Sequence, residues 1–187
     1  MRRLFLLAAL LLTGCASVPP APQLMSRPAG AEQHPFVLSG RIAVKHDGNR
    51  SSANVRWTHR PEDDDILLLA PFGQTVARIH SDAREVVLDT SDKHYTAQNT
   101  EELTQRVLGW HLPLAGLRYW VLALPAPDSE ARIEHDANGQ TTTLQQDDWE
   151  IRYTRYATPS PDSLPTRISL QREGMELQLV VDEWEIK

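Results

Sequence analysis

The sequence contains a single cysteine, Cys15, among 187 residues. One cysteine excludes an internal disulfide, a CxxC redox pair and a cysteine-rich zinc site. Long apolar runs are also missing, because the longest one, residues 4–12, falls well short of the about 20 residues that a membrane-spanning helix needs. Positive charge is in deficit as well, since 19 Lys and Arg stand against 25 Asp and Glu. This acidic balance argues against binding to nucleic acid or another polyanion.

Sequence motifs of the common enzyme classes are absent too. The chain has no GxSxG, HExxH, P-loop or GxGxxG motif, and no two of its histidines have the spacing of a helical metal site. Carboxylates gather at Glu62-Asp63-Asp64-Asp65 and at Asp147-Asp148, and a glycan hydrolase could use such a pair. Their positions, beside Pro61 and before Trp149, favour solvated turns instead. We therefore expect no catalytic residue, no metal and no cofactor.

Residues 1–14 have the pattern of a signal peptide. Two arginines precede the apolar run, whose length is within the roughly 7–15 residues typical of a signal-peptide core. The following Leu12-Thr13-Gly14-Cys15 resembles the lipobox of bacterial lipoproteins, which implies that Cys15 becomes the acylated first residue of the mature chain. About two acyl chains suffice for stable attachment to a membrane. The alternative is a conventional secreted protein with a cysteine near its cleavage site.

Residues 15–34 have the composition of a flexible tether. They contain four prolines and few large apolar groups, so the folded domain is expected at residues 35–187. Ala16 and Ser17 follow the cysteine, and in enterobacterial-type sorting the absence of Asp there favours the outer membrane over the inner one.

Alternation of apolar and polar side chains predicts strands on both sides of a helical middle. Phe36, Leu38, Ile42 and Val44 share one face, and a turn at residues 47–49 predicts a hairpin with the next strand. The apolar run at residues 66–70 indicates a strand buried on both faces or the wall of an apolar cavity. Strands are also expected at residues 75–80, 84–89 and 94–97, and about five more follow the helices. A change of phase predicts a bulge around residues 181–183.

Two short helices are expected between these sets of strands. Asn99 and Glu102 have the spacing of a capping box, which predicts a helix over residues 100–110. Leu117, Trp120, Val121 and Leu124 form a second helical stripe that Pro125 ends. The predicted fold is mainly β, a single curved antiparallel sheet that forms an unclosed β-barrel, with two or three short helices as a lid or plug over an apolar cavity.

Aromatic side chains can belong either to the hydrophobic core or to a binding site. The five tryptophans lie on apolar stripes, which favours core or cavity wall over a sugar-stacking set. Arg41 is expected to face solvent by the alternation of its strand. Phe72 lies in the turn-forming Pro71-Phe72-Gly73-Gln74, where an aromatic side chain is more often tucked inward. If exposed, it would be a membrane-contacting group.

Several segments, spread over essentially the whole chain, carry a family resemblance. In order they are Leu12-Thr13-Gly14-Cys15, Gly40-Arg41-Ile42-Ala43-Val44, Trp57, Leu67-Leu68-Leu69-Ala70-Pro71-Phe72-Gly73, Leu112-Pro113-Leu114, Leu117-Arg118-Tyr119-Trp120, Leu124-Pro125, Trp149 with Ile151 and Tyr153, Leu164-Pro165, and Trp184. In this order they resemble the LolB family of outer-membrane lipoprotein receptors.

The resemblance implies an unclosed antiparallel β-barrel whose helices cover an apolar cavity. It implies three partners: a LolA-like periplasmic carrier without a lipid anchor, acylated lipoprotein cargo, and outer-membrane lipid. The protein would be a monomer anchored to the outer membrane of a Gram-negative bacterium, facing the periplasm. The family has an exposed apolar residue, commonly Leu, in the loop after the third strand, and it is implicated in inserting cargo into the membrane. Phe72 occupies that position here.

Alternation and helical spacing select the residues expected to line the acyl-chain cavity. On the sheet they are Phe36, Leu38, Ile42, Val44, Val55, Trp57 and Leu68, and on the lid they are Leu117, Trp120 and Val121. Two other functions stay open: a structural or assembly lipoprotein with a filled core and no cargo cavity, and an envelope hydrolase that uses its carboxylates on glycan.

Overall fold

A computed structural model describes residues 27, 30 and 34–186. The signal peptide at residues 1–14, Cys15 and most of the tether lie outside the described residues. The assignments made for them therefore remain predictions.

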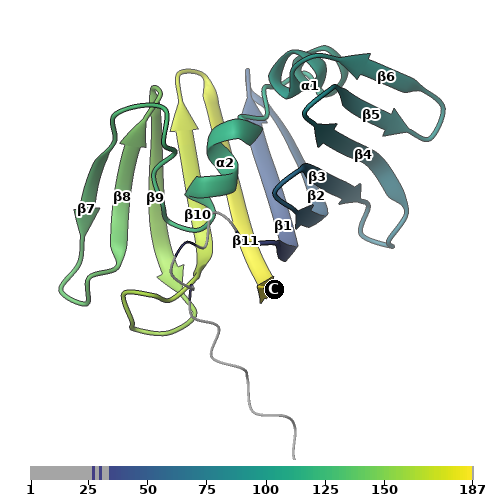
Figure 1. The fold of residues 1–187 in the computed structure, drawn as a ribbon. Helices are drawn as coiled ribbons and strands as arrows, with labels where there is room; N and C mark the ends of the chain where they lie inside the picture. The colour runs from purple at the N-terminus through teal and green to yellow at the C-terminus, as the bar shows by residue number, and fades with distance from the viewer. Residues whose placement is uncertain (1–26, 28–29, 31–33, 187) are drawn as a thin grey trace, which may run out of the picture.

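The described chain forms one antiparallel sheet of eleven strands (Figure 1). The strands are β1 (Phe36–His46), β2 (Asn49–His59), β3 (Asp63–Leu69), β4 (Thr75–Asp82), β5 (Val86–Thr90), β6 (His94–Ala97), β7 (Arg132–His135), β8 (Thr141–Gln146), β9 (Trp149–Tyr156), β10 (Pro165–Arg172) and β11 (Met175–Ile186). They lie in the order β6-β5-β4-β3-β2-β1-β11-β10-β9-β8-β7, and within the described part of the chain β6 and β7 do not pair to close a barrel. The expected arrangement of six strands, two helices and five strands is confirmed.

The first and last strands pair at the centre of the sheet. Ser39 pairs with Glu183 and Gly40 pairs with Val181, which leaves Asp182 as an extra residue in β11. This is the bulge that the phase change predicted, and it lets residues on both sides of it face the interior.

The first helix starts where the sequence predicts, the second starts before its predicted stripe, and both end earlier than predicted. The helix α1 (Thr100–Leu108) begins with the Asn99 side chain accepting a hydrogen bond from the Glu102 amide, and Gly109 ends it with a left-handed φ of 81°. The helix α2 (Leu114–Trp120) does not continue to Pro125, as the apolar stripe suggested. The chain instead turns over residues 121–123, where Ala123 has a φ of 57°. The buried stripe continues through this turn, so periodicity alone overestimated the length of the helix.

The sheet curves around α2, which lies over its middle, while α1 lies beside β5 and β6 (Figure 1). One continuous apolar core joins the sheet to both helices. All five tryptophans belong to it, and none is more than 7% exposed. Their assignment to the core or to a cavity wall is confirmed, and Arg41 is exposed as expected.

The acidic run before the apolar strand was interpreted wrongly. Asp63, Asp64 and Asp65 are not turn residues, because β3 begins at Asp63. Its alternation of buried and half-buried side chains includes all three of them. Asp64 faces the interior and is 2% exposed. The second acidic pair does form a turn: Asp147 and Asp148 connect β8 to β9 with left-handed φ values of 53° and 63°.

Candidate functional site

A small apolar cavity lies between the sheet and the segment that contains α2. Its lining comes from β1, β2, β3, β4 and β11 on the sheet side and from residues 110–117 on the helix side. The lining residues are Leu38, Ile42, Val55, Trp57, Ile66, Leu68, Ile79, Trp110, Leu112, Leu117, Leu177 and Leu179. The volume of about 20 Å³ has room for about one water molecule, and no polar side chain other than the Trp indoles contributes to the lining.

Six of the ten residues chosen from the sequence line this cavity: Leu38, Ile42, Val55, Trp57, Leu68 and Leu117. The other four, Phe36, Val44, Trp120 and Val121, are buried in the surrounding core and outside the lining. Whether any of them contacts an acyl chain remains a prediction.

Of the other six lining residues, Ile66 belongs to the apolar run that was expected as a possible cavity wall. Sequence reasoning missed Ile79 on β4, Leu177 and Leu179 on β11, and Trp110 and Leu112 between the helices. The alternation of apolar residues in the last strand was visible in the sequence. The pairing of that strand with the first strand was not. That pairing sets Leu179 opposite Ile42. Leu112 is held in the roof by its amide, which donates to the Thr104 hydroxyl at 3.0 Å.

A buried carboxylate joins the sheet to α2 beside the cavity. Asp64 Oδ1 accepts from the Trp57 indole Nε1 at 2.8 Å and lies 2.7 Å from His59 Nδ1. Its other oxygen, Oδ2, lies 3.1 Å from Nη2 of Arg118 on α2. Three groups that carry N–H donors thus surround one carboxylate, which is how a buried charge becomes tolerable.

On the far side of α2 the contacts to the sheet are neutral. Trp120 Nε1 donates to Gln146 Oε1 at 2.8 Å, and the Tyr153 hydroxyl donates to the Trp120 carbonyl at 2.8 Å. Burial raises the pKa of Tyr153 well above its ordinary value, so the phenol stays protonated and keeps donating. Gln146 Nε2 also donates to the carbonyls of Ala126 and Ser129, at 2.8 and 3.0 Å.

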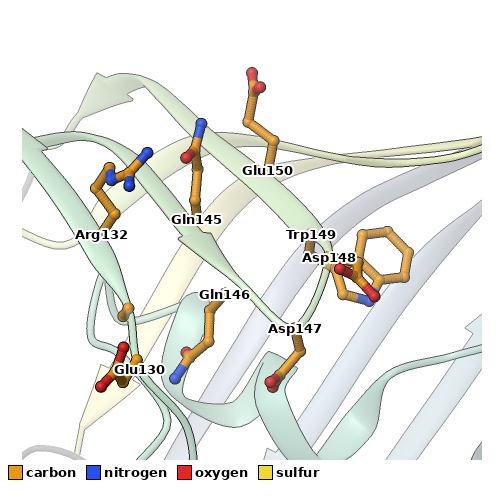
Figure 2. A pocket seen from close by; sticks show the side chains of 9 residues that line it. Glu130, Arg132, Gln145, Gln146, Asp147, Asp148, Trp149 and Glu150 are labelled. Carbon is orange, nitrogen blue, oxygen red and sulfur yellow. The ribbon is translucent and has the colours of Figure 1, made fainter.

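A larger, open pocket surrounds the β8–β9 turn (Figure 2). It has a volume of about 580 Å³ and is lined by Glu130, Ala131, Arg132, Gln145, Gln146, Asp147, Asp148, Trp149 and Glu150. Figure 2 shows Asp147 and Glu150 pointing away from each other, so these two carboxylates do not face a common substrate position. Its lining is mostly polar, which does not suit an acyl chain.

Phe72 projects into solvent from the β3–β4 connection. It is 90% exposed, as the family resemblance implied and contrary to the usual inward packing of an aromatic residue in a turn. The Gly73 amide donates to the Ala70 carbonyl at 2.9 Å, and the Ala70 amide donates to the Gln74 carbonyl at 2.8 Å, so the turn is closed by backbone hydrogen bonds. Val76, the extra residue of a bulge in β4, is 50% exposed nearby in the chain. The tip of this hairpin thus presents apolar side chains to the outside.

The described residues form neither a metal cluster nor a membrane-spanning helix. Within residues 27, 30 and 34–186, no three His, Cys, Asp or Glu side chains gather as a metal would require. No helix in the same part of the chain has the length and apolar character needed to cross a bilayer.

Comparison with solved structures supports the fold. A LolA superfamily protein from Nitrosomonas europaea superposes with a TM-score of 0.53 at 11% identity, covering 83% of this chain and 87% of that one. A DUF1329 family protein from Desulfovibrio piger gives a TM-score of 0.52 at 7% identity, covering 83% and 86%. At these identities the likeness shows a shared fold.

Comparison of sequences identifies the family. The family model described as outer membrane lipoprotein LolB matches residues 34–184. The outer-membrane lipoprotein LolB of Chromobacterium violaceum is 40% identical to this chain, and the match covers 99% of each of the two chains. That of Nitrosomonas europaea is 40% identical over 87% of this chain and 78% of its own.

The family assigns a role in lipoprotein localisation at the outer membrane, and not an enzymatic one. The envelope hydrolase considered from the acidic runs therefore has no support from the relatives. From the match over nearly all of the folded region, we conclude that this chain belongs to the outer membrane lipoprotein LolB family.

Proposed function

We propose that this protein accepts acylated lipoproteins from a LolA-like periplasmic carrier and inserts them into the outer membrane. The acyl chains are held between the curved sheet and α2. The observation that carries the proposal is the apolar cavity beneath α2, lined by residues of five strands and of the helical segment. In this division of the chain, residues 1–14 are a signal peptide, residues 15–34 an acylated tether and residues 35–187 the cargo-binding domain.

The volume of the cavity requires a movement of the lid. A space of about 20 Å³ is far too small for an acyl chain. In this proposal the structure is therefore the closed form, and cargo enters as α2 moves away from the sheet. Each methylene displaced from water into the opened cavity contributes about 0.8 kcal/mol.

Direct transfer between two cavities avoids exposing the cargo to water. An acyl chain of about sixteen carbons costs on the order of 12 kcal/mol to expose, at about 0.8 kcal/mol per methylene. If carrier and receptor join cavity to cavity, most of that cost does not arise. Each tenfold preference for the receptor then requires about 1.4 kcal/mol, so differences in affinity can drive transfer without nucleotide hydrolysis.

Phe72 is the proposed membrane-inserting residue. Its side chain is 90% exposed at the tip of a hairpin whose turn is closed by backbone hydrogen bonds. Full burial of an aromatic side chain of this size contributes roughly 1.5–3 kcal/mol. That gain suffices to bring the hairpin into the lipid interface for delivery while the acylated Cys15 keeps the domain at the membrane.

One observation favours a second function. The interior is nearly filled in this form, as expected of a structural lipoprotein that binds other envelope proteins without a cargo cavity. The two functions differ in whether the interior ever takes up a hydrocarbon chain.

The test mixes the mature chain carrying Cys15→Ala with a LolA-like carrier loaded with a radiolabelled lipoprotein. The variant lacks the predicted acylation site, so no detergent or vesicle competes for the cargo. After separation by size and affinity tag, we expect the label on the receptor. Label that stays entirely on the carrier would contradict the proposed function and favour the structural one.

A further inference from the structure

The two sides of α2 are attached to the sheet in chemically different ways. On the cavity side the attachment is an ion pair, and on the β8–β9 side it is a set of neutral, buried hydrogen bonds. We propose that α2 is a hinged lid whose latch is the Asp64–Arg118 ion pair and whose hinge is Trp120 with its partners Gln146 and Tyr153. This inference rests on the proposed function, because the lid covers the proposed cargo cavity.

The latch joins the same two elements that form the floor and the roof of the cavity. Asp64 lies on β3 with the lining residues Ile66 and Leu68, which follow it at two-residue intervals on the same interior face. Arg118 directly follows the lining residue Leu117 on α2. Breaking the ion pair therefore frees the part of α2 that lies over the cavity.

The latch can open without leaving a bare charge on the sheet. Trp57 and His59 are both on β2, so they stay beside Asp64 when α2 leaves. Arg118 has a side chain that is 33% exposed already, and it only has to move further into water. A buried carboxylate that keeps two donors avoids the large penalty of an unpaired buried charge.

In the closed latch, one hydrogen-bond donor of Arg118 has no partner among the described residues. The Nε atom of Arg118 is buried and finds no hydrogen-bond partner among the described residues. A buried N–H group without a partner destabilises the state that buries it. Closure is therefore favourable enough to shield the cavity and weak enough to be reversible.

The hinge side has more contacts, and they are buried. The Trp120 indole is 1% exposed, lies 6.2 Å from the Trp149 ring and donates to Gln146. Gly116 provides the space for it, since a Cβ there would lie 2.4 Å from the indole. Arg27 adds a contact just beyond the helix, because its Nη1 atom donates to the Leu122 carbonyl at 2.8 Å.

The test measures the distance between two spin labels in the mature chain carrying Cys15→Ala, without lipid. The labels replace the exposed Ala115 on α2 and the exposed Arg84 in the β4–β5 turn. With Arg118→Met we expect the population with a longer distance to rise about tenfold, which corresponds to about 1.4 kcal/mol. Arg118→Lys keeps the charge and should retain most of the short-distance population.

Two further variants separate a latch from a general loss of stability. Arg106→Met removes an exposed arginine of the other helix, which donates to the Thr96 carbonyl, and should leave the distances unchanged. Gln146→Leu removes hinge contacts and should lower the Tm with less opening than Arg118→Met. Unchanged distances in Arg118→Met, or equal opening in Gln146→Leu, would overturn the proposal.

Uptake of a dansylated fatty acid by the same variants distinguishes the lid from the cargo function. Longer distances with faster uptake in Arg118→Met support both. Longer distances with no uptake in any variant support the latch and contradict the cavity as a cargo site. Uptake that is equally fast in wild type and Arg118→Met, with unchanged distances, overturns the latch and leaves the cargo function standing.

Discussion

Gly40 lies directly against the backbone of Val180: a Cβ atom added to this glycine would be 2.1 Å from the Val180 carbonyl oxygen. The contact occurs where the bulge at Asp182 brings β11 close to β1. Since β1 and β11 are the central pair of the sheet, the close approach lies where its two halves meet.

The Gly40→Ala variant should therefore be strongly destabilised. The methyl group meets backbone, which cannot swing aside as a side chain does, so we expect a loss of roughly 2–4 kcal/mol in the free energy of unfolding. Urea denaturation monitored by tryptophan fluorescence measures it. Gly48→Ala is a poor control because φ is positive there, whereas Ser39→Ala is a suitable neighbour. A loss under about 1 kcal/mol would show that the strands separate easily at this point.

Leu68 and Leu69 form a matched pair for testing the cargo cavity. Leu68 lines the cavity, while the adjacent Leu69 is half-buried on the other face of β3. Leu68→Gln should lower retention of lipoprotein cargo at least about tenfold, because an amide would face the hydrocarbon chain without a partner. Leu69→Gln should retain cargo. Equal retention by the two variants, at similar Tm, would argue against acyl chains in this cavity.

Phe72→Glu should separate acceptance of cargo from its delivery. The side chain is exposed and does not pack in the core, so the free energy of unfolding and the transfer of cargo from the carrier should stay unchanged. A carboxylate at the tip does not enter the lipid interface, so delivery to vesicles should fall about tenfold or more. Phe72→Leu, which keeps an apolar side chain at the tip, is the control. Normal delivery by Phe72→Glu would remove this residue from the mechanism.

Asp136 should contribute stability that disappears in acid. Its carboxylate accepts hydrogen bonds from the backbone amides of Gln140 and Asn138, which hold its pKa below the ordinary value of 3.8. A lowered folded pKa means that the contribution is complete above the unfolded pKa and is lost as pH falls through the folded one. The stability difference between wild type and Asp136→Asn should therefore shrink below about pH 4. Denaturation curves across this range test it, and a constant difference would contradict it.

Local patterns in the sequence were sufficient for the strands, the first helix and the bulge. Each depends on neighbours in the chain: alternation sets the face of Ile42 and Val44, and the Asn99 side chain starts α1 by bonding an amide three residues on. The same local reasoning failed at Asp64, where polarity suggested a turn. The hydrogen-bond donors that make its burial tolerable come from β2 and α2. The acidic run by itself gives no sign that these donors lie close to Asp64.

The sequence by itself thus determined the β-rich fold, the anchoring signal as a prediction, and the family. The tertiary structure alone decided that Leu179 lies opposite Ile42 across the β1–β11 pair and that Arg118 meets Asp64. The physical reason is that periodicity records which face of an element is apolar. Which faces meet is settled by burying all of them at once, and that depends on residues distant in the chain.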